Sequence, residues 1–401
     1  MRETYIPYGA YWSTPFVRWQ GSFSHLHPLE FAAHVAKAEL KRRSIDPKSF
    51  DFGVLGVTIP SPKSFWGLPW ITGMIGAAHV GGPTVSQACA TSARCLQMAS
   101  QEVGAGMSDC TLVVGADKCS NGPHLYYPDP GGAGGTGTHE DWVLDNFNAD
   151  PFARCGMINT AENVAKKFGV TTQQQHDVKL RRYEQYQQAC ASDHAFHKRY
   201  MTLPFEVPDP KFRKTVKTLS GDEGVHPTTA EGLSGLKPVL PGGTVTYGGQ
   251  THPADGNSVV IVTTREKAKT LSANPKVEIR LLGYGLARTD VAHMPYAPVP
   301  AAKRALESAG LSIKDIDAVK THNPFAVNDV VFALETGFDL MKMNNYGCSL
   351  VWGHPQGPTG LRSIIEMIEE LVMRGGGRGL FTGCAAGDSA MAAVLEVRDA
   401  G

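Results

Sequence analysis

Short continuous apolar runs alternate along this chain with longer stretches in which apolar residues recur every three or four positions. Strands are predicted at residues 4–12, 52–58, 111–116, 277–282, 318–321, 349–352 and 379–382. Helices are predicted at residues 29–43, from Cys89 onward, and at 157–168, 172–200, 301–309 and 361–372. Uninterrupted apolar strands are typical of sheets covered on both faces. The pattern therefore predicts an α/β fold.

The second half of the chain repeats the plan of the first. Cys89 and His354 both stand at the entry to a predicted helix, and Cys119 and Cys384 each follow 30 positions later (119 − 89 and 384 − 354). We predict two βαβ-rich halves that meet at the N-termini of these helices. The first half comprises residues 1–119 and 242–268, and the second half comprises residues 269–401. The insertion comprises residues 120–241.

The insertion starts with the glycine-rich tract 131–137. The tract lacks the G-x-x-x-x-G-K-[ST] pattern of a phosphate loop, and no strand leads into it. We therefore expect a mobile surface loop there.

Composition indicates a soluble globular protein of 401 residues, long enough for two domains or one duplicated fold. Lysine plus arginine and aspartate plus glutamate balance at 38 each, so no overall charge attracts nucleic acid or an anionic membrane. No apolar run is long enough to span a membrane, and the N-terminus does not resemble a signal peptide. Eight cysteines without a C-x-x-C pair predict reduced thiols in the cytoplasm rather than a zinc site or disulfides.

Cys89 is the first candidate for chemistry. It follows the extended run 83–85 and opens a helical pattern among small residues. A thiol near the positive end of a helix dipole is expected to have a lowered pKa, which favours the reactive thiolate. A buried structural cysteine, behaving as a small core hydrophobe, explains this stretch equally well.

Three further segments fall at the ends of predicted strands, where open α/β sheets place their sites. They are residues 322–325 (His-Asn-Pro-Phe), 353–357 (Gly-His-Pro-Gln-Gly) and 383–387 (Gly-Cys-Ala-Ala-Gly). Taken alone, such a histidine is more often a structural hydrogen-bonding group, and a second cysteine is usually inert. The joint occurrence of all these segments indicates an active site.

These segments are similar to motifs of the thiolase superfamily, and the resemblance covers nearly the whole chain. Residues 85–93 resemble its nucleophile motif, and residues 353–362 resemble its G-H-P-x-G-x-[ST]-G-x-R. Residues 383–390 stand where the family has C-x-G-G-G, and residues 156–162 are similar to its G-x-T-A-E helix start. The combination in this order is specific, although no single motif is.

The resemblance implies the thiolase fold: two βαβ-rich halves with mixed five-stranded sheets, α-β-α-β-α layers, and a loop domain inserted in the first half. It implies cleavage of a 3-ketoacyl-CoA by coenzyme A, or the reverse Claisen condensation, through an acyl-Cys89 intermediate. His354 would be the base that deprotonates Cys89. Coenzyme A is then the co-substrate, and no metal is expected in this chain.

The resemblance also assigns the remaining catalytic roles. Cys384 would move the proton of the substrate α-carbon or of the coenzyme A thiol. The backbone N–H groups of Cys89 and of Ala386 or Gly387 would hold the oxyanion of the covalent step. His322, together with the base, would hold the enolate oxygen of the Claisen step.

The chain departs from the family pattern in three places. His322-Asn-Pro-Phe325 replaces the common N-E-A-F and resembles the sterol-carrier-type and archaeal-type subgroups. Alanines replace two glycines after Cys384, and residues 248–252 replace the G-N-A-S-G stretch that lines the pantetheine arm. A polar acyl group or altered coenzyme A contacts would account for the added polar side chains. The residues expected to contact the acyl group or coenzyme A are Met157, Gln250, Thr251 and Phe325.

The aromatic start, residues 10–23, is expected to pack against a neighbouring subunit. Similar thiolases act on aromatic acyl-CoA intermediates, including benzoylsuccinyl-CoA, so an aromatic or dicarboxylic acyl-CoA is our substrate hypothesis. The resemblance further implies a homodimer formed beside the nucleophile helix and a small partner subunit with an OB-fold and a zinc ribbon.

Other function classes stay open. A ketoacyl synthase shares the fold and the nucleophile but uses two histidines; Cys384 is expected to take the place of the second, which favours thiolase chemistry. A non-catalytic acyl-CoA-binding subunit would explain the altered loops, but the joint presence of Cys89, His354 and Cys384 argues against it. A papain-like hydrolase also has a cysteine–histidine pair, yet nothing here resembles its flanking motifs.

Overall fold

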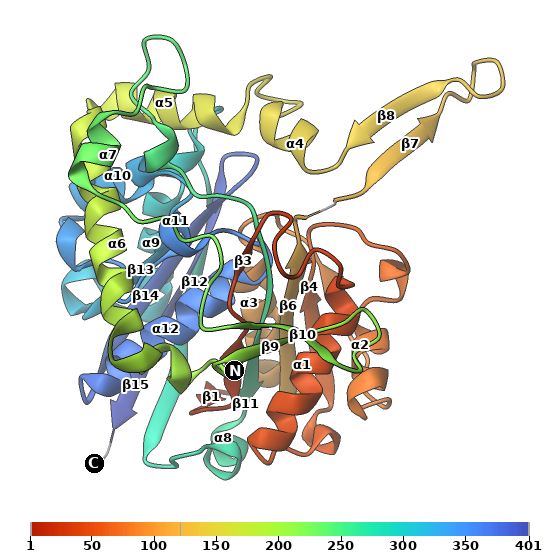
Figure 1. The fold of residues 1–401 in the computed structure, drawn as a ribbon. Helices are drawn as coiled ribbons and strands as arrows, with labels where there is room; N and C mark the ends of the chain where they lie inside the picture. Colours follow the sequence, from red (N-terminus) through yellow and green to blue (C-terminus); the bar gives the residue numbers. More distant parts are fainter. Residues whose placement is uncertain (1, 121, 400–401) are drawn as a thin grey trace.

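The computed structural model describes residues 2–120 and 122–399, and most of its strands belong to one mixed sheet (Figure 1). Within these residues the order of the sheet is β13-β14-β15-β12-β1-β11-β6-β4-β5, with β2 and β3 paired to β11. The strands are β1 (Thr4–Pro7), β2 (Tyr11–Ser13), β3 (Val17–Arg18), β4 (Phe52–Gly56), β5 (Thr84–Val85), β6 (Cys110–Lys118), β11 (Ala254–Thr263), β12 (Val277–Arg288), β13 (Ala318–His322), β14 (Gly376–Ala385) and β15 (Ser389–Asp399).

Strand β1 joins the two halves of this sheet. It pairs antiparallel with β11 only where Tyr5 faces Thr263, and with β12 along its whole length. In the first half β4 runs parallel to β5 and β6, and β6 runs antiparallel to β11. In the second half β13 is parallel to β14, and β15 is antiparallel to β14 and β12. Both halves are therefore mixed, as expected, but their sheets form one connected path.

Helices cover the sheet in layers. α3 and α12 pack against each other and against strands of both halves, so they form the central layer (Figure 1). α1 and α2 cover the first half, and α9 covers the second. The arrangement is the α-β-α-β-α layering that the resemblance implied. These helices are α1 (Pro28–Arg42), α2 (Gly67–Ile75), α3 (Thr91–Ala105), α9 (Pro298–Ala309) and α12 (Thr359–Met373). Two further helices are α8 (Arg265–Leu271) and α10 (Ala326–Thr336), and α10 packs against α9.

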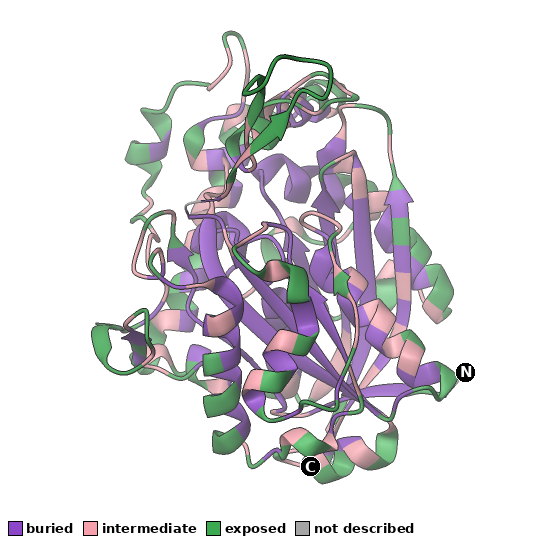
Figure 2. Cartoon of the chain, turned by 90° about the vertical axis from the view of Figure 1, so that its right-hand side faces the viewer, coloured by how far each residue is buried: buried purple, intermediate pink, exposed green. Residues whose placement is uncertain are grey.

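The strands of the first half are buried on both faces because helices cover both sides of the sheet. Successive side chains of a strand point to opposite faces, so neighbouring residues join different clusters. On β6, Val113 joins the cluster that contains Leu96 of α3. Its neighbours Leu112 and Val114 join the cluster that contains Leu40 of α1. Figure 2 shows the resulting buried interior, with exposed residues on outer helices, loops and the strands at the surface. The uninterrupted apolar run predicted this burial correctly.

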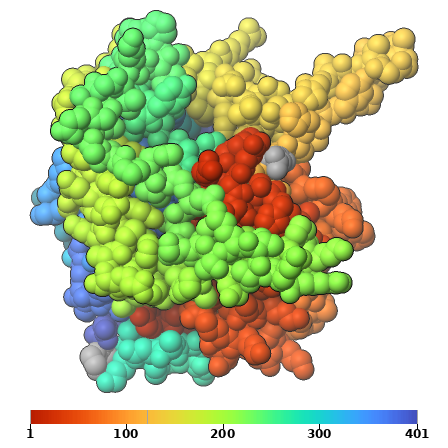
Figure 3. Space-filling model, in the orientation of Figure 1, coloured from red at the N-terminus to blue at the C-terminus, as the bar shows by residue number. Residues whose placement is uncertain are grey.

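Between β6 and β11 the chain leaves the main sheet. The elements of this part are β7 (His124–Pro128), β8 (Gly137–Asp141), α4 (Leu144–Asn148), α5 (Met157–Phe168), α6 (Thr172–His194), β9 (Phe205–Pro208), β10 (Thr215–Leu219) and α7 (Ala230–Ser234). The glycine-rich tract connects β7 to β8, and this exposed hairpin extends away from the body of the molecule (Figure 3). None of the helices among the described residues is long and apolar enough to cross a membrane.

Several predicted segments differ in the structure. Residues 4–12 form two strands because Gly9, at φ +78°, turns the chain between them. The helix predicted over 172–200 loses its regular geometry at residues 191–193. The aromatic start, expected to pack against a neighbouring subunit, places most of its large side chains inside this chain. The buried ones are Tyr11, Trp12, Phe16 and Phe23.

The strand predicted at 349–352 is instead the short helix α11 (Ser349–Trp352). Its backbone is bound by side chains rather than by a neighbouring strand. Asn323 Oδ1 accepts from the N–H of Leu350 at 3.1 Å, and Nζ of Lys179 donates to the Leu350 carbonyl at 2.7 Å. Among the described residues, no strand therefore continues the main sheet beyond β13.

Candidate active site

A cavity of about 320 Å³ opens onto Cys89. It is lined by both halves of the fold and by the insertion. Its lining residues are Ala88, Cys89, Phe147, Asn148, Met157, Ile158, Val239, Tyr247, Gln250, Thr251, Pro253, Met294, Pro324, Phe325, His354, Gln356 and Ala386. Most of these side chains are apolar, as in small-molecule sites generally.

Cys89 lies in a tight turn just before α3. Ala88 has φ +44°, a left-handed conformation that is rare for residues other than glycine. The turn is held by Thr91, whose hydroxyl donates to the carbonyl of Ala88 at 2.6 Å and accepts from the N–H of Gln87 at 2.8 Å. The strained turn presents the sulfur at the cavity wall while the helix starts two residues later.

His354 is held behind the cavity by α12. Its Nδ1 lies 2.7 Å from the hydroxyl of Thr359, and both residues are buried. The other ring nitrogen, Nε2, is buried and has no hydrogen-bond partner among the described residues. When Nδ1–H donates to Thr359, Nε2 presents its lone pair to the site. This is the tautomer that a general base requires.

His322 stacks on His354, with ring centroids 3.9 Å apart and an angle of 25° between the rings. Its Nδ1 lies 2.9 Å from the hydroxyl of Ser349, and its Nε2 is also buried without a described partner. The Cys89 sulfur and a ring nitrogen of each histidine lie within 4.8 Å of one another. The structure thus brings together three of the four predicted catalytic side chains.

Burial controls the protonation of this trio. It lowers the pKa of His322 to about 3, and it lowers the pKa of His354 well below the ordinary value, an effect to which the neighbouring His322 adds. Both imidazoles are therefore neutral near neutral pH. Neutral His354 can accept a proton. His322 donates a hydrogen bond from Nε2 in the tautomer in which the Ser349 hydroxyl turns from Asn323 Oδ1, at 3.1 Å, to His322 Nδ1.

The expectation of a lowered pKa for Cys89 is wrong. Burial raises the pKa of this thiol to about 12, although hydrogen bonds from the backbone N–H groups of Ala386 and of Cys89 itself act in the opposite direction. Desolvation of the thiolate outweighs these donors. Cys89 therefore rests as a thiol, and its attack on a substrate requires transfer of the proton to a base such as His354.

Cys384 ends β14 and is fully buried. Nδ2 of Asn328 donates to its sulfur at 3.4 Å. Burial, and then the proximity of Cys89, raise the pKa of Cys384 well above its ordinary value. The fourth predicted catalytic residue is thus a neutral thiol next to Cys89.

The loop after β14 contributes the predicted oxyanion donors. The N–H of Ala386 points at the Cys89 sulfur, and Ala386 lines the cavity. Gly387, at φ +77°, turns the chain, and Asp388 accepts from the N–H groups of Ala292 and His293 at 2.8 and 2.9 Å. Ala386 is therefore the better placed of the two alternative donors.

All four residues predicted to contact the acyl group or coenzyme A line the cavity: Met157, Gln250, Thr251 and Phe325. Met157 is the first residue of α5. The backbone of Gln250 forms a β-bridge with Phe325, and the N–H of Thr251 donates to the carbonyl of Pro324 at 2.8 Å. These bonds join the 248–252 stretch to the His322 segment in one wall.

Two buried carboxylates fix the loops that carry the histidines. Asp329, fully buried, accepts from Arg182 Nε at 2.9 Å and from Asn323 Nδ2 at 2.8 Å, which anchors the segment after His322. Asp117 on β6 accepts from the N–H of Gly357 at 2.7 Å, which anchors the loop after His354. Each histidine is therefore positioned by a rigid, hydrogen-bonded support.

Sequence reasoning missed the residues that orient the trio. Thr359 lies inside the quoted 353–362 motif, so that motif was the available signal for it. Ser349 and Asn328 carry no signal of their own, because they reach the site only through tertiary contacts. Two histidines, His322 and His354, stand together beside Cys89, so the presence of Cys384 does not by itself distinguish this site from that of a ketoacyl synthase.

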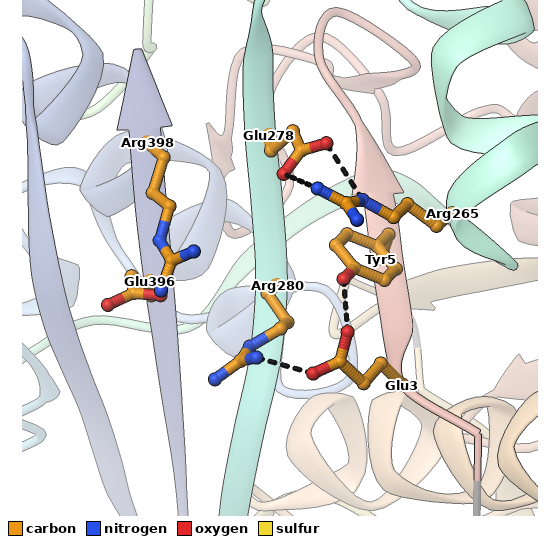
Figure 4. Close-up of a pocket in the computed structure, with 7 residues that line it drawn as sticks. All are labelled: Glu3, Tyr5, Arg265, Glu278, Arg280, Glu396 and Arg398. Carbon is orange, nitrogen blue, oxygen red and sulfur yellow. Dashed lines mark hydrogen bonds and ion pairs between the residues drawn. The ribbon is translucent and has the colours of Figure 1, made fainter. Parts of the chain in front are cut away.

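A second hollow lies between β1, β12 and β15 and is highly charged (Figure 4). Arg265 pairs with Glu278 at 2.9 Å, Arg280 with Glu3 at 2.5 Å, and Arg398 with Glu396 at 2.8 Å. The hydroxyl of Tyr5 donates to Glu3 at 2.5 Å. Its charges are thus paired, and its lining contains no nucleophile, so it is not the catalytic site.

Comparison with known proteins places these features in a family. The family model described as thiolase, N-terminal domain, matches residues 10–266, and that described as thiolase, C-terminal domain, matches residues 275–397. An acetyl-CoA acetyltransferase of Allochromatium vinosum is 30% identical over 380 residues, covering 94% of this chain and 95% of that protein. The beta-ketothiolase BktB of Cupriavidus necator is 30% identical over 382 residues, with the same coverage. The crystal structure of human mitochondrial 3-ketoacyl-CoA thiolase matches with a TM-score of 0.89 and 26% identity, covering 98% of this chain and 99% of that one.

Proposed function

This chain belongs to the thiolase family and is an acyltransferase of that family, and we propose that it transfers an acyl group between a 3-ketoacyl-CoA and coenzyme A through a thioester on Cys89. The observation that carries the proposal is the convergence of the Cys89 sulfur with ring nitrogens of His322 and His354 at the wall of an apolar cavity. A human 3-ketoacyl-CoA thiolase of the same fold, 26% identical with a TM-score of 0.88, has been solved in complex with CoA, which supports coenzyme A as the co-substrate.

In the first step, His354 Nε2 takes the Cys89 proton as the sulfur attacks the 3-keto carbon. Attack by a thiol with a high pKa is productive only when the proton moves in the same step. The N–H groups of Cys89 and Ala386, which hydrogen-bond to the Cys89 sulfur in the resting protein, would donate to the attacked oxygen as it becomes negative. Breaking the bond between the α and β carbons leaves the thioester on Cys89.

The departing acetyl-CoA leaves as an enolate. Its oxygen would accept a hydrogen bond from Nε2–H of His322, and its α-carbon would take the proton of the Cys384 thiol. Coenzyme A then enters and gives its thiol proton to the Cys384 thiolate. Its sulfur attacks the thioester, the bond between the acyl carbon and Cys89 breaks, and the departing Cys89 thiolate takes back the proton held on His354 as the shortened acyl-CoA is released. The same steps in reverse form a carbon–carbon bond, so Claisen condensation uses the same residues.

The cavity lining favours an apolar acyl group. Phe147, Ile158, Met157, Met294 and Phe325 contribute apolar surface. The lining contains no lysine or arginine, as far as the described residues go, so the carboxylate of a dicarboxylic acyl-CoA would have no cation to pair with there. Of the aromatic and the dicarboxylic acyl-CoA, the aromatic acyl group without a second carboxylate is therefore the better match to the cavity. Benzoylsuccinyl-CoA carries a further carboxylate, so its binding is a more demanding test of the substrate hypothesis.

The assembly is proposed on separate grounds. Strand β5 ends the sheet order, and Thr84 on it is exposed, so this edge can pair with β5 of a second copy next to the nucleophile turn. The family resemblance supports a further, small OB-fold partner with its own zinc ribbon. Light scattering at several concentrations tests the homodimer, and co-purification from the native source tests the partner.

The catalytic proposal is tested by mass spectrometry after the protein is mixed with 3-ketoacyl-CoAs from acetoacetyl to long-chain, aromatic and dicarboxylic forms. We expect an acyl mass on the Cys89 peptide that is released by free coenzyme A and is absent in Cys89→Ser. The acyl groups that accumulate identify the substrate class. If no member of the panel acylates Cys89, and addition of a co-purified partner changes nothing, the catalytic proposal is wrong.

A further inference from the structure

A second group of potential ligand atoms lies away from the catalytic trio, where helix α6 ends. Cys190, His194 and His197 each offer one atom, and these atoms all lie within 4.8 Å of one another. The Nδ1 atoms of the two histidines are 3.2 Å apart. Cys190 and His194 are half-buried, whereas His197 is only 1% exposed.

The backbone is arranged to bring these side chains together. Ala191 has an extended ψ of 157°, and Ser192, Asp193 and His194 have φ of +51°, +57° and +57°, so the regular geometry of α6 is lost from Ala191 onward. The short 3-10 helix η3 (His197–Arg199) follows. His194 is the fourth residue after Cys190, a spacing that places both on one face of a regular helix, and the break carries the chain into η3, which adds His197 to the group.

Space is reserved for the His194 ring by Gly221. A Cβ at Gly221 would meet Cε1 of that ring at 2.8 Å, closer than real Cβ contacts. On the other side, the Nε2 atom of His197 is buried without a hydrogen-bond partner among the described residues. A buried polar nitrogen without a partner is costly, so the contact between the Nδ1 atoms does not satisfy all the polar atoms of the His197 ring.

The charged groups around the cluster are already committed elsewhere. Asp222 receives two bonds from the guanidinium of Arg362, at 2.6 and 2.8 Å, and one from the hydroxyl of Tyr186 at 3.1 Å. The Tyr186 ring lies 5.6 Å from the ring of His197. The cluster itself therefore consists of one thiol and two imidazoles, without a free carboxylate.

We propose that Cys190, His194 and His197 form a Zn²⁺ site. A thiolate and two imidazoles are the ligands that Zn²⁺ prefers, and carboxylate-binding ions such as Mg²⁺ or Ca²⁺ have no oxygen ligand from this trio. Cys190 gives up its proton to solvent on binding. Because Cys190 and His194 are half-buried, a water molecule can complete the tetrahedron.

The site would fix the end of α6. It joins the last regular turn of that helix to the residues that follow the break and to η3. Through His197 and Tyr186 it backs onto the Asp222–Arg362 pair, and Arg362 belongs to α12, whose first residue is Thr359. The ion would thus stabilise the contact between the insertion and the central layer.

The test uses the full chain without a histidine tag, in a Cys89→Ala background that removes the catalytic trio as a competing ligand set. Co²⁺ is titrated as a spectroscopic probe, and zinc content is measured after dialysis by mass spectrometry of the element. We expect one equivalent of metal per chain, a cobalt–thiolate charge-transfer band, and a higher melting temperature with Zn²⁺ than with a chelator. The second substitution is Cys190→Ser or His194→Ala, with Cys155→Ser as the matched control.

Loss of a direct ligand should weaken binding by at least about tenfold, the lower bound for loss of even an outer-shell partner. Cys190→Ser should also abolish the charge-transfer band, whereas Cys155→Ser should leave both affinity and band unchanged. His194→Ala covers the case in which Cys190→Ser fails to fold. Failure of the Cys89→Ala protein to bind Co²⁺ or Zn²⁺, or unchanged binding when Cys190 or His194 is replaced, would overturn the proposal.

Discussion

The hydrogen bond between Thr359 and His354 offers a direct test of how this site works. The hydroxyl lies 2.7 Å from Nδ1, and Thr359 is fully buried. Thr359→Val keeps the shape of the side chain and removes the partner of Nδ1. The base then loses the bond that fixes its tautomer and that stabilises the imidazolium formed when it takes the proton of Cys89.

The expected effect follows from the charge that this bond supports. A hydrogen bond to a charged group contributes about 1.5–3 kcal/mol, and leaving a buried partner unsatisfied costs a similar amount. If that contribution is lost in the acylation transition state, the rate of acylation falls about 10- to 150-fold. The stability of the fold should fall by a comparable free energy or less, because His354 stays neutral in the resting protein.

Single-turnover acylation of Cys89, followed by quenched mass spectrometry, measures this rate without interference from product release. Thr359→Ser restores the hydroxyl and should recover most of the rate. Ser363→Ala is the matched control, since Ser363 is equally buried one turn later in α12 and its hydroxyl bonds to the carbonyl of Thr359. A wild-type rate in Thr359→Val, or an equally slow Thr359→Ser, would refute the role given to this bond.

Three further predictions concern stability. Burial holds the pKa of His322 near 3, below its value of about 6.5 in an unfolded chain, so acidification protonates this histidine in the unfolded state first. The free energy of unfolding should therefore fall by about 2 kcal/mol between pH 7 and pH 5. Urea unfolding of His322→Asn should show a smaller fall over the same pH range. Arg182→Ala leaves the buried charge of Asp329 unpaired and should cost about 3–5 kcal/mol in denaturant unfolding, whereas the exposed neighbour Arg181→Ala should cost at most about 1 kcal/mol; equal losses would contradict the reasoning. Gly360→Ala places a Cβ 2.9 Å from the side chain of Ser92, so it should lower the melting temperature and slow acylation together, and an unchanged protein would show that the two helices can separate.

Much of the fold could be predicted because the relevant information is local. The continuous run 111–116 and the helical period of 361–372 depend only on which residues are apolar, and both elements are present. The prediction of a strand at 349–352 was wrong because a short apolar run is compatible with either a strand or a buried helix. Its conformation is decided by Asn323 and Lys179, which reach it from distant parts of the chain.

The site shows the same division. The positions of Cys89 and His354 at helix starts could be predicted from the motifs. The pKa of Cys89 could not, because the helix dipole is a local effect whereas desolvation depends on how the rest of the chain closes over the thiol. The stacking of His322 on His354 could not be predicted either, since it depends on the packing of two separate loops.

The packing of α3 against α12 in the central layer explains why the nucleophile turn and the histidine loop meet. The hydroxyl of Ser92, in the first turn of α3, donates to the carbonyl of Gly357, two residues before α12 begins. A Cβ at Gly115 would meet that same carbonyl oxygen at 3.0 Å. Small residues thus let the nucleophile turn and the histidine loop approach closely. The site is therefore asymmetric: the N-terminal part of the chain supplies the thiol, and the C-terminal part supplies His354, the proposed base.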